Sequence, residues 1–248
     1  MLQEIQRLLR VPNRSFFLFG PRSVGKSVWL EQNFKNTLSL DLLETNTFLE
    51  LSRDPSLLEA KIAAEPEKKW VCIDEIQKIP TLLNEVHRLM GKTNRRFALT
   101  GSSARKLKRG GADLLAGRAI TLHIEGFAYS EIHKRFDLEN RLQWGSLPLV
   151  VLNPKEAAEI LQAYVHTYIR EEIKEEGLVR NAEPFIRFLE VAGIVNGQIL
   201  NKENIARDAK VPRSTVDVYF SILEDTLLGH FLHPFRAQAK VREVATPK

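Results

Sequence analysis

The feature that most constrains this chain is a glycine-rich segment near its N-terminus, placed between an apolar run and a helical pattern. Ser15–Phe19 reads Ser-Phe-Phe-Leu-Phe, and Gly20–Ser27 reads Gly-Pro-Arg-Ser-Val-Gly-Lys-Ser. Glycines allow a turn whose backbone N–H groups point inward, and the start of a helix adds partial positive charge. A strand, this loop and a helix in that order predict a phosphate-binding loop.

Each position of the loop has an expected role. Lys26 is expected to reach the β- and γ-phosphates, and the Ser27 hydroxyl to hold Mg²⁺. Arg22 is open to two interpretations, because its side chain would face either solvent or a partner's phosphate. The residues predicted to bind the nucleotide are Gly20, Pro21, Arg22, Ser23, Val24, Gly25, Lys26 and Ser27.

A second motif follows about fifty residues later. Trp70–Ile73 is an apolar strand pattern, and Asp74 and Glu75 come directly after it. Adjacent carboxylates repel each other, and a bound divalent cation offsets that repulsion. We expect Asp74 to bind Mg²⁺ and Glu75 to take a proton from an attacking water, which is general-base chemistry. Together with the phosphate loop, this pair predicts nucleoside-triphosphate hydrolysis.

Small polar residues follow the next strand pattern, Phe97–Thr100. A hydroxyl of Thr100 or Ser102 would orient the water between the γ-phosphate and the general base. The alternative is helix N-capping by Ser102 or Ser103, and both interpretations can hold.

Arg118 is the candidate arginine finger, in cis or from a neighbouring subunit, because it follows a glycine directly before a strand pattern. Arg105 is a rival for this role, and either arginine is otherwise a surface charge. Between Lys92 and Arg118, eight basic residues face a single acid, Asp113. This stretch indicates either a solvated surface or a surface that binds phosphates.

The fold class follows from the alternation of strand and helix patterns. Five short apolar segments alternate with helical stretches up to about residue 126, which predicts a largely parallel α/β sheet flanked by helices. Helical patterns follow alone. We therefore expect a P-loop NTPase core at residues 1–126, a helical lid or linker at 127–180 and a winged-helix-like domain at 181–248. The strand patterns are Ser15–Phe19, Thr37–Leu42, Trp70–Ile73, Phe97–Thr100 and Ile120–Ile124, and the main helical ones Gly25–Asn36, Asn46–Ala64, Pro80–Met90, Ala128–Phe136, Pro154–Glu176 and Glu183–Val195.

The last third has helix-turn-helix spacing. Lys202–Ala209 and Ser214–Leu223 are helical patterns separated by a short turn, and Gly229–Pro234 is a candidate wing. DNA contact and a structural or protein-binding role both stay open, because few cations are present at the start of the second helix. The candidate base-reading residues are Arg213, Ser214, Thr215 and Asp217.

The composition excludes some classes of protein and of metal site. The single cysteine, Cys72, rules out an intrachain disulfide and a cysteine-rich metal site, and it favours the cytoplasm. No apolar run approaches 18 residues, so we expect no membrane span. Met1–Arg10 is interpreted as an amphipathic helix. The net charge of +5 by itself does not indicate nucleic acid.

These motifs together resemble prokaryotic AAA-like ATPases of the archaeal-ATPase type. The resemblance rests on the loop Gly20–Ser27, on Ile73–Gln77 (Ile-Asp-Glu-Ile-Gln), on Leu99–Ser103 (Leu-Thr-Gly-Ser-Ser) and on Leu115–Arg118 (Leu-Ala-Gly-Arg), in that order. It implies an ATPase core with a winged helix, usually followed by a further C-terminal domain, so we expect this chain to stop short of that domain. It also implies ATP rather than GTP.

The leading hypothesis is Mg²⁺-dependent ATP hydrolysis that moves the helical part against the core. The second is a slow nucleotide-dependent switch or scaffold that recruits DNA or a protein partner, and a homo-oligomer is also possible. A P-loop kinase is a third option, and Glu75 argues against it.

Overall fold

The computed structural model describes residues 5–102, 115, 117–169, 173, 181–233 and 247. The chain divides into two compact units, Met1–Leu161 and Gln162–Lys248, and each is described by itself. This division lies between the two boundaries expected from the sequence, and the threefold division at residues 126 and 180 stays a prediction. Within the described ranges, no helix is both long and apolar enough to cross a membrane.

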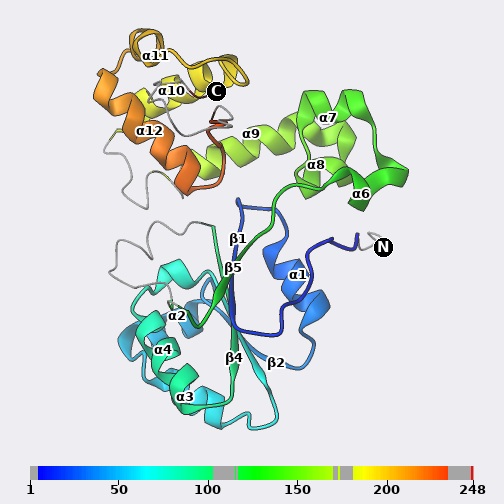
Figure 1. Ribbon diagram of the computed structural model, residues 1–248, viewed down its shortest axis with the longest axis vertical. Coiled ribbons are helices and arrows are strands. Elements are labelled where there is room, and N and C mark those ends of the chain that lie inside the picture. The colour runs from blue at the N-terminus through cyan, green and yellow to red at the C-terminus, as the bar shows by residue number, and fades with distance from the viewer. Residues whose placement is uncertain are drawn as a thin grey trace, which may run out of the picture. The chain divides into compact units, whose positions relative to one another are not determined.

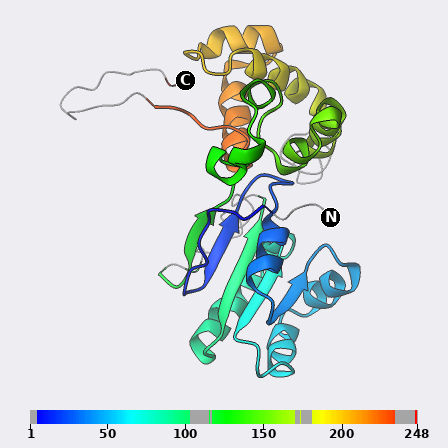
Figure 2. The same ribbon diagram turned by 90° about the vertical axis from the view of Figure 1, so that its right-hand side faces the viewer.

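The N-terminal unit is built on a five-stranded sheet with the order β2-β3-β4-β1-β5 (Figure 1). Every strand pairing is parallel, and Figure 2 shows the strands side by side in this order. The predicted α/β class with a parallel sheet is confirmed. The strands are β1 (Phe16–Phe19), β2 (Thr37–Asp41), β3 (Trp70–Asp74), β4 (Arg96–Gly101) and β5 (Ile120–His123).

Helices cover both faces of this sheet, with α1 on one side and α3 and α4 on the other (Figure 1). A break at Asp54-Pro55 divides the helical stretch predicted at Asn46–Ala64 into α2 and α3, because a residue before proline is driven out of helical geometry and Asp54 is extended. The helices up to β4 are α1 (Lys26–Asn33), α2 (Thr45–Arg53), α3 (Leu57–Ala63), the 3₁₀ turn η1 (Ile76–Lys78) and α4 (Leu82–Lys92).

An aromatic cluster fixes α1 against the sheet. Phe16, Trp29, Phe34 and Trp70 pack with ring centroids 4.9–6.0 Å apart, mostly edge to face. Such contacts add to the burial of large apolar side chains. Because Phe16 begins β1 and Trp29 lies in α1, this cluster holds the loop between them at both ends.

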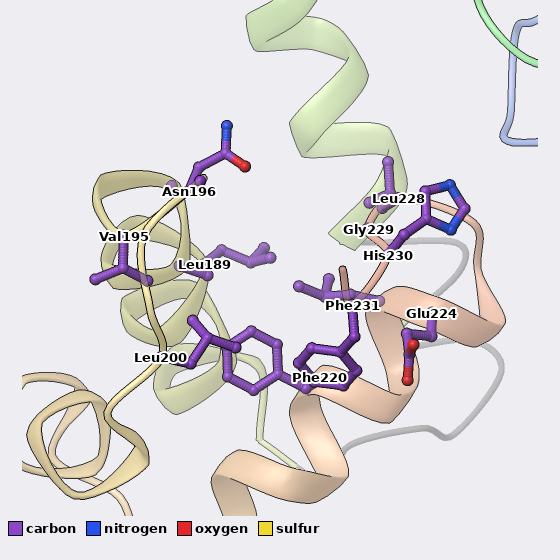
Figure 3. A pocket seen from close by; sticks show the side chains of 14 residues that line it. Leu189, Val195, Asn196, Leu200, Phe220, Glu224, Leu228, Gly229, His230 and Phe231 are labelled. Carbon is purple, nitrogen blue, oxygen red and sulfur yellow. The ribbon is translucent and has the colours of Figure 1, made fainter. Parts of the chain in front are cut away.

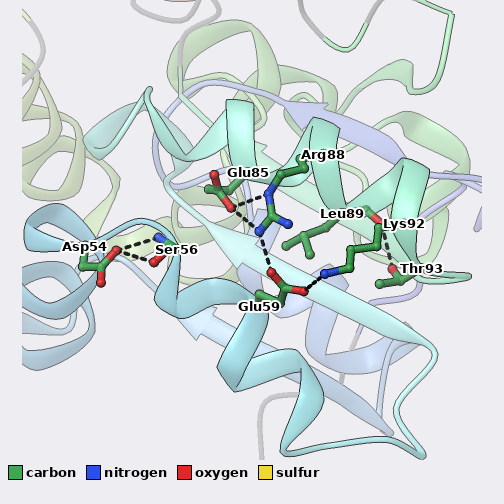
Figure 4. A network of polar contacts seen from close by, with 8 residues as sticks. All are labelled: Asp54, Ser56, Glu59, Glu85, Arg88, Leu89, Lys92 and Thr93. Atoms are coloured by element: carbon green, nitrogen blue, oxygen red, sulfur yellow. Dashed lines mark hydrogen bonds and ion pairs between the residues drawn. The ribbon is translucent and has the colours of Figure 1, made fainter.

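An ion-pair network joins α3 to α4 on the surface of the same unit (Figure 4). Glu59 of α3 accepts from Arg88 and from Lys92 of α4, and Arg88 also pairs with Glu85. The hydrogen bonds from Lys92 and Arg88 hold the pKa of the Glu59 carboxyl below its ordinary value. Exposed pairs of this kind contribute little to stability each, so the network orients the two helices more than it holds them.

The segment after β5 is helical, as predicted, but in shorter pieces. The sequence did not reveal α7 or α8. In α7, Leu138 and Leu142 are exposed, so that this helix has no apolar face. Instead, Asp137 begins α7 by accepting from the Asn140 N–H. The elements are α6 (Tyr129–Ile132), η2 (His133–Arg135), α7 (Leu138–Trp144), α8 (Pro148–Leu152), η3 (Pro154–Glu156) and α9 (Ala157–Tyr168).

The amphipathic helix expected at Met1–Arg10 is wrong for the described residues 5–10, which are not helical. Their backbone groups are bound elsewhere. The N–H of Leu8 donates to the carboxylate of Glu131, and the carbonyl of Leu9 accepts from the indole of Trp29. Tertiary hydrogen bonds therefore replace the intrahelical ones that the pattern predicted.

The C-terminal unit has an aromatic core of its own, in which Phe185, Phe188, Tyr219 and Phe220 contact one another. Lys210 adopts a left-handed conformation and ends the first helix of the helix-turn-helix pair. Residues 229–233 contain no strand and Pro234 lies outside the described residues, so the wing stays a prediction. The helices are α10 (Ala182–Ile194), α11 (Lys202–Ala209) and α12 (Arg213–Asp225).

Candidate functional site

The carboxyl ends of β1, β3 and β4 meet at one edge of the sheet, which is where open parallel sheets bind ligands. The phosphate loop follows β1, the acid pair lies at the end of β3, and Ser102 follows β4. β4 lies between β1 and β3, so its last residues lie between the strand that leads into the loop and the strand that carries the acids. The topology therefore brings three of the predicted motifs to one place.

The loop Gly20–Ser27 curls around the Lys26 ammonium. Lys26 is buried, and its Nζ donates to the carbonyls of Gly20 at 2.9 Å and Pro21 at 3.1 Å. Gly25 has φ +89° at the start of α1, a conformation that glycine adopts without strain. At Gly20, a β-carbon would lie 2.1 Å from the Ile124 carbonyl, so no larger residue fits.

Asp74 connects the loop to the neighbouring strands. Its Oδ2 accepts from the Ser27 hydroxyl at 2.5 Å, and its Oδ1 accepts from the Thr100 hydroxyl. The Thr100 oxygen accepts in turn from the Glu75 N–H at 3.1 Å. Hydroxyl and carboxylate oxygens are the donor set that Mg²⁺ prefers, usually with substrate phosphates and water completing the shell. Ser27 and Asp74 therefore fit the predicted Mg²⁺ site.

No larger metal cage is present in the part of the chain that the structure describes, where no three His, Cys, Asp or Glu side chains gather. Nearby Cys72 is not a reactive group, because burial raises its pKa to about 11 and keeps the thiol neutral. A metal at this edge would thus depend on Ser27 and Asp74 together with groups of the nucleotide.

Glu75 is held by Gln77, the last residue of the Ile73–Gln77 motif, to which the motif itself assigned no role. The side-chain amide of Gln77 donates both to Glu75 Oε2 and, at 3.1 Å, to the Ser102 hydroxyl. Gln77 is buried, and its Oε1 has no hydrogen-bond partner in the described ranges. A β-carbon at Gly101 would lie 2.8 Å from this Oε1. The signal in the sequence was a glutamine two positions after a strand-end acid.

Thr100 and Ser102, the two candidate water-orienting residues, are both buried but have different contacts. Thr100 contacts Asp74 and the backbone of Glu75, whereas Ser102 contacts Gln77. The alternative of helix N-capping by Ser102 or Ser103 stays a prediction, because Ser103 and the residues directly after it lie outside the described residues, as does Arg105.

Arg118 does not lie beside Asp74, Glu75 and Thr100. It precedes Ile120, which pairs with Phe16 at the opposite end of β1 from the loop, about 13 Å away for four residues of strand. Its Nη1 donates to the His87 carbonyl of α4 at 3.2 Å. The part of the arginine-finger prediction that placed it in cis therefore lacks support, and a contact with a neighbouring subunit stays a prediction.

The basic stretch between Lys92 and Arg118 is tied to protein groups wherever it is described. Lys92 pairs with Glu59, and Arg95 donates to the carbonyls of Lys68 and Pro66. Arg96 lies over the Trp70 ring, 5.7 Å from its centroid. These contacts favour the interpretation as a solvated surface for the described members.

A cavity of about 370 Å³ lies in the C-terminal unit, between α10 and α12 (Figure 3). Leu189, Leu200, Phe220 and Phe231 line it, and Asn196, Glu224 and His230 supply its polar groups. Its lining is mostly apolar, and it contains none of the residues predicted to bind nucleotide.

Comparison with known proteins agrees with the geometry of the N-terminal unit. Residues 12–133 match a family described as an AAA domain. The N-terminal half of this chain is an AAA domain. This confirms the resemblance to AAA-like P-loop ATPases. Residues 135–248, which include the whole C-terminal unit, match a family described only as a domain of unknown function.

One curated relative is an uncharacterised protein of Haemophilus influenzae, 25% identical over 256 residues. The match covers 90% of this chain, and the chain spans 64% of the length of that relative.

Three solved structures resemble the chain at low similarity. They are the Aeropyrum pernix ORC2 protein in its ADP form (16% identical, 88% of this chain and 80% of that one, TM-score 0.43), the Aeropyrum pernix ORC1 protein in complex with DNA (11%, 87% and 78%, 0.39) and AMPPCP-bound DnaA from Aquifex aeolicus (12%, 87% and 83%, 0.35).

Proposed function

We propose that the AAA domain binds ATP with Mg²⁺ and hydrolyses it to ADP and phosphate. The observation that carries this proposal is the set of contacts around Asp74, whose two oxygens accept from Ser27 of the loop and Thr100 of β4. One carboxylate thus links the phosphate-binding segment to the strand that carries the candidate water-orienting hydroxyl. Such an arrangement suits a cation bound between a carboxylate and phosphates.

In the proposed reaction, Lys26 leaves the carbonyls of its own loop and binds the β- and γ-phosphates. Water attacks the γ-phosphorus, the bond to the β,γ-bridging oxygen breaks, and the water proton passes to the Glu75 carboxylate. Ser27 and Asp74 would hold the Mg²⁺, which neutralises phosphate charge. Thr100 fixes the backbone at Glu75 and so helps to aim the base.

The second candidate is a slow nucleotide-dependent switch with little turnover. The observation that favours it is the hydrogen bond from Gln77 to Glu75, because an oxygen engaged there is less able to accept a proton from water. In both candidates, nucleotide binding would alter the segments after β4 and β5 and so move the helical region.

The test is ATP turnover by the wild type beside Glu75→Gln and Lys26→Ala, with nucleotide affinity measured on all three. Loss of a general base lowers turnover by about 10²- to 10⁴-fold, so Glu75→Gln is expected to bind ATP normally and to turn over at that reduced rate. Lys26→Ala is expected to lose binding. Equal turnover by the wild type and Glu75→Gln would refute the hydrolytic role and leave the switch.

A further inference from the structure

The side chain of Arg7 connects its own N-terminal segment to the phosphate loop and to the segment that follows β5. Its Nε donates to Glu131 Oε1 at 3.0 Å, its Nη1 to the Val24 carbonyl at 3.0 Å, and its Nη2 to the Glu125 carbonyl at 2.5 Å. The guanidinium also lies over the Phe127 ring, 4.8 Å from its centroid. Arginine suits such a place because its planar fork offers several donors in fixed directions.

Glu131 is fixed as firmly as its partner. Its Oε1 also accepts from the Leu8 N–H at 2.7 Å, and its Oε2 accepts from the Ala128 N–H at 2.9 Å. The two side chains are only 8% and 4% exposed, so water competes little for these bonds. Buried charges persist in this way when they are paired and hydrogen-bonded, and removing one partner is costly.

The contact with Val24 matters because Val24 belongs to the phosphate loop. In a trans peptide the carbonyl of one residue and the N–H of the next point in opposite directions, and no cis peptide occurs among the described residues. When Arg7 binds the Val24 carbonyl, the N–H of Gly25 must therefore point away from Arg7. Inward-pointing N–H groups are what such a loop offers to a phosphate.

From this geometry we infer that Arg7 is a positioning residue for nucleotide binding, and that Glu131 holds it in place. Arg7 keeps the Val24–Gly25 peptide in the orientation that presents the Gly25 N–H to phosphate. The inference rests on the proposed function, since it concerns the same loop. It adds a residue outside the loop motif, together with a physical link from the loop to the segment that follows β5.

The same pair supplies a route by which nucleotide would be sensed beyond the loop. Glu125 and Glu131 flank Phe127, and α6 begins at Tyr129, so Arg7 binds the start of the helical region and the loop with one side chain. A change in the Val24 peptide on phosphate binding would alter the bonds that Arg7 makes to this segment.

The experiment measures the dissociation constants of ATP and ADP for Arg7→Met, Arg7→Lys and Glu131→Gln, at a temperature where circular dichroism shows each variant to be folded. Arg10→Met is the matched control, because Arg10 lies exposed in the same segment. A lost hydrogen bond to a charged group corresponds to about a tenfold to hundredfold weaker binding, which we expect for Arg7→Met with both nucleotides.

Intermediate weakening is expected for Arg7→Lys, which keeps the charge but not the fork, and for Glu131→Gln. Turnover at saturating ATP should stay within about threefold of the wild type, because a positioned loop binds ground state and transition state alike. A merely structural role would instead lower the melting temperature and leave the affinity of the folded protein unchanged.

The inference is overturned if folded Arg7→Met binds both nucleotides as tightly as Arg10→Met does. If Arg7→Met does not fold, Glu131→Gln decides, and an unchanged affinity there overturns it equally. Absence of nucleotide binding by the wild type would be a separate result, since it refutes the proposed function itself.

Discussion

Polar side chains are arranged differently in the two units of this protein. At the carboxyl edge of the N-terminal sheet, Lys26, Asp74, Thr100 and Gln77 come from separate elements and lie at one place, and all but the half-buried Asp74 are buried. On the helix-turn-helix pair of the C-terminal unit, charged side chains lie on the surface and neutralise one another. A converging set is prepared to receive a ligand, whereas a self-paired set has little left to offer one.

The pairing on α11 and α12 involves two of the four candidate base-reading residues, Arg213 and Asp217. Asp217 accepts from Lys202 at 2.6 Å and from Arg213, and Arg213 also pairs with Glu203. The bonds from Lys202, and then from Arg213, hold the pKa of Asp217 below its ordinary value. Binding to DNA needs cations that are free to meet phosphates. The pairing of these charges therefore favours a structural or protein-binding role for this helix pair.

The largest effect on stability is expected for Phe188→Ala in the C-terminal core. Phe188 is fully buried, and its ring lies 4.9 Å from that of Phe220 and 5.3 Å from that of Tyr219. Such a truncation costs about 3–5 kcal/mol of the free energy of unfolding. We expect hydrogen exchange to show opening of the C-terminal unit while ATP affinity is retained.

Exposed Ile194, at the end of α10, provides the control, since Ile194→Ala should leave the stability nearly unchanged. A loss of ATP affinity in folded Phe188→Ala would show that the two units do not act separately.

A smaller effect is expected for Gln77→Leu, which removes the donor to Glu75 and Ser102. If Gln77 orients Glu75, turnover should fall by about tenfold to a hundredfold in Gln77→Leu, with little change in ATP affinity. The turnover of Gln77→Asn should lie between those of the wild type and Gln77→Leu. Steady-state kinetics checks this. A rise in turnover would instead favour the slow switch, in which Gln77 restrains Glu75.

The smallest effect is expected for Asp217→Asn, which releases Lys202 and Arg213. Wild-type protein should bind duplex DNA no more tightly than the usual non-specific range of about 10⁻⁴–10⁻⁶ M, and the variant should bind slightly more tightly, as anisotropy with labelled DNA would show. Sequence-specific binding by the wild type that Asp217→Asn weakens would contradict the self-paired surface.

The sign of the pH dependence follows from the lowered pKa of Asp217. A carboxyl whose pKa is lower in the folded state stabilises that state above its ordinary pKa, and this stabilisation is lost as the pH falls through the lowered value. Protonation of Asp217 in acid should therefore release Lys202 and Arg213, as Asp217→Asn does. DNA affinity measured at falling pH should approach that of Asp217→Asn.

Local sequence was sufficient for the strands and for the loop, because buried parallel strands and glycine turns are specified by neighbouring residues. It was insufficient where distant residues decide. The segment around Arg7 has a helical pattern, but Glu131 and Trp29 capture its backbone from more than a hundred and about twenty positions away, respectively. The role proposed for Arg118 rested on its motif alone. The strand register shows that Arg118 lies toward the amino ends of the strands, away from the phosphate loop.

In the helix-turn-helix pair, too, the local sequence predicted the helices but not the contacts between distant residues. The spacing of α11 and α12 predicted the two helices correctly, yet spacing says nothing about which charges pair across them. Lys202 and Asp217 are fifteen positions apart, and they meet only because the turn brings one helix against the other. A motif therefore specified the fold here better than it specified the function.

Calorimetric titration of ATP with and without Mg²⁺ shows whether the carboxyl edge of the sheet is a Mg²⁺–nucleotide site. Wild type and Asp74→Asn are compared, with folding of both verified. We expect Mg²⁺ to strengthen ATP binding to the wild type, and Asp74→Asn to lose this gain. Equal affinities with and without Mg²⁺ in the wild type, or an undiminished gain in Asp74→Asn, would contradict this expectation.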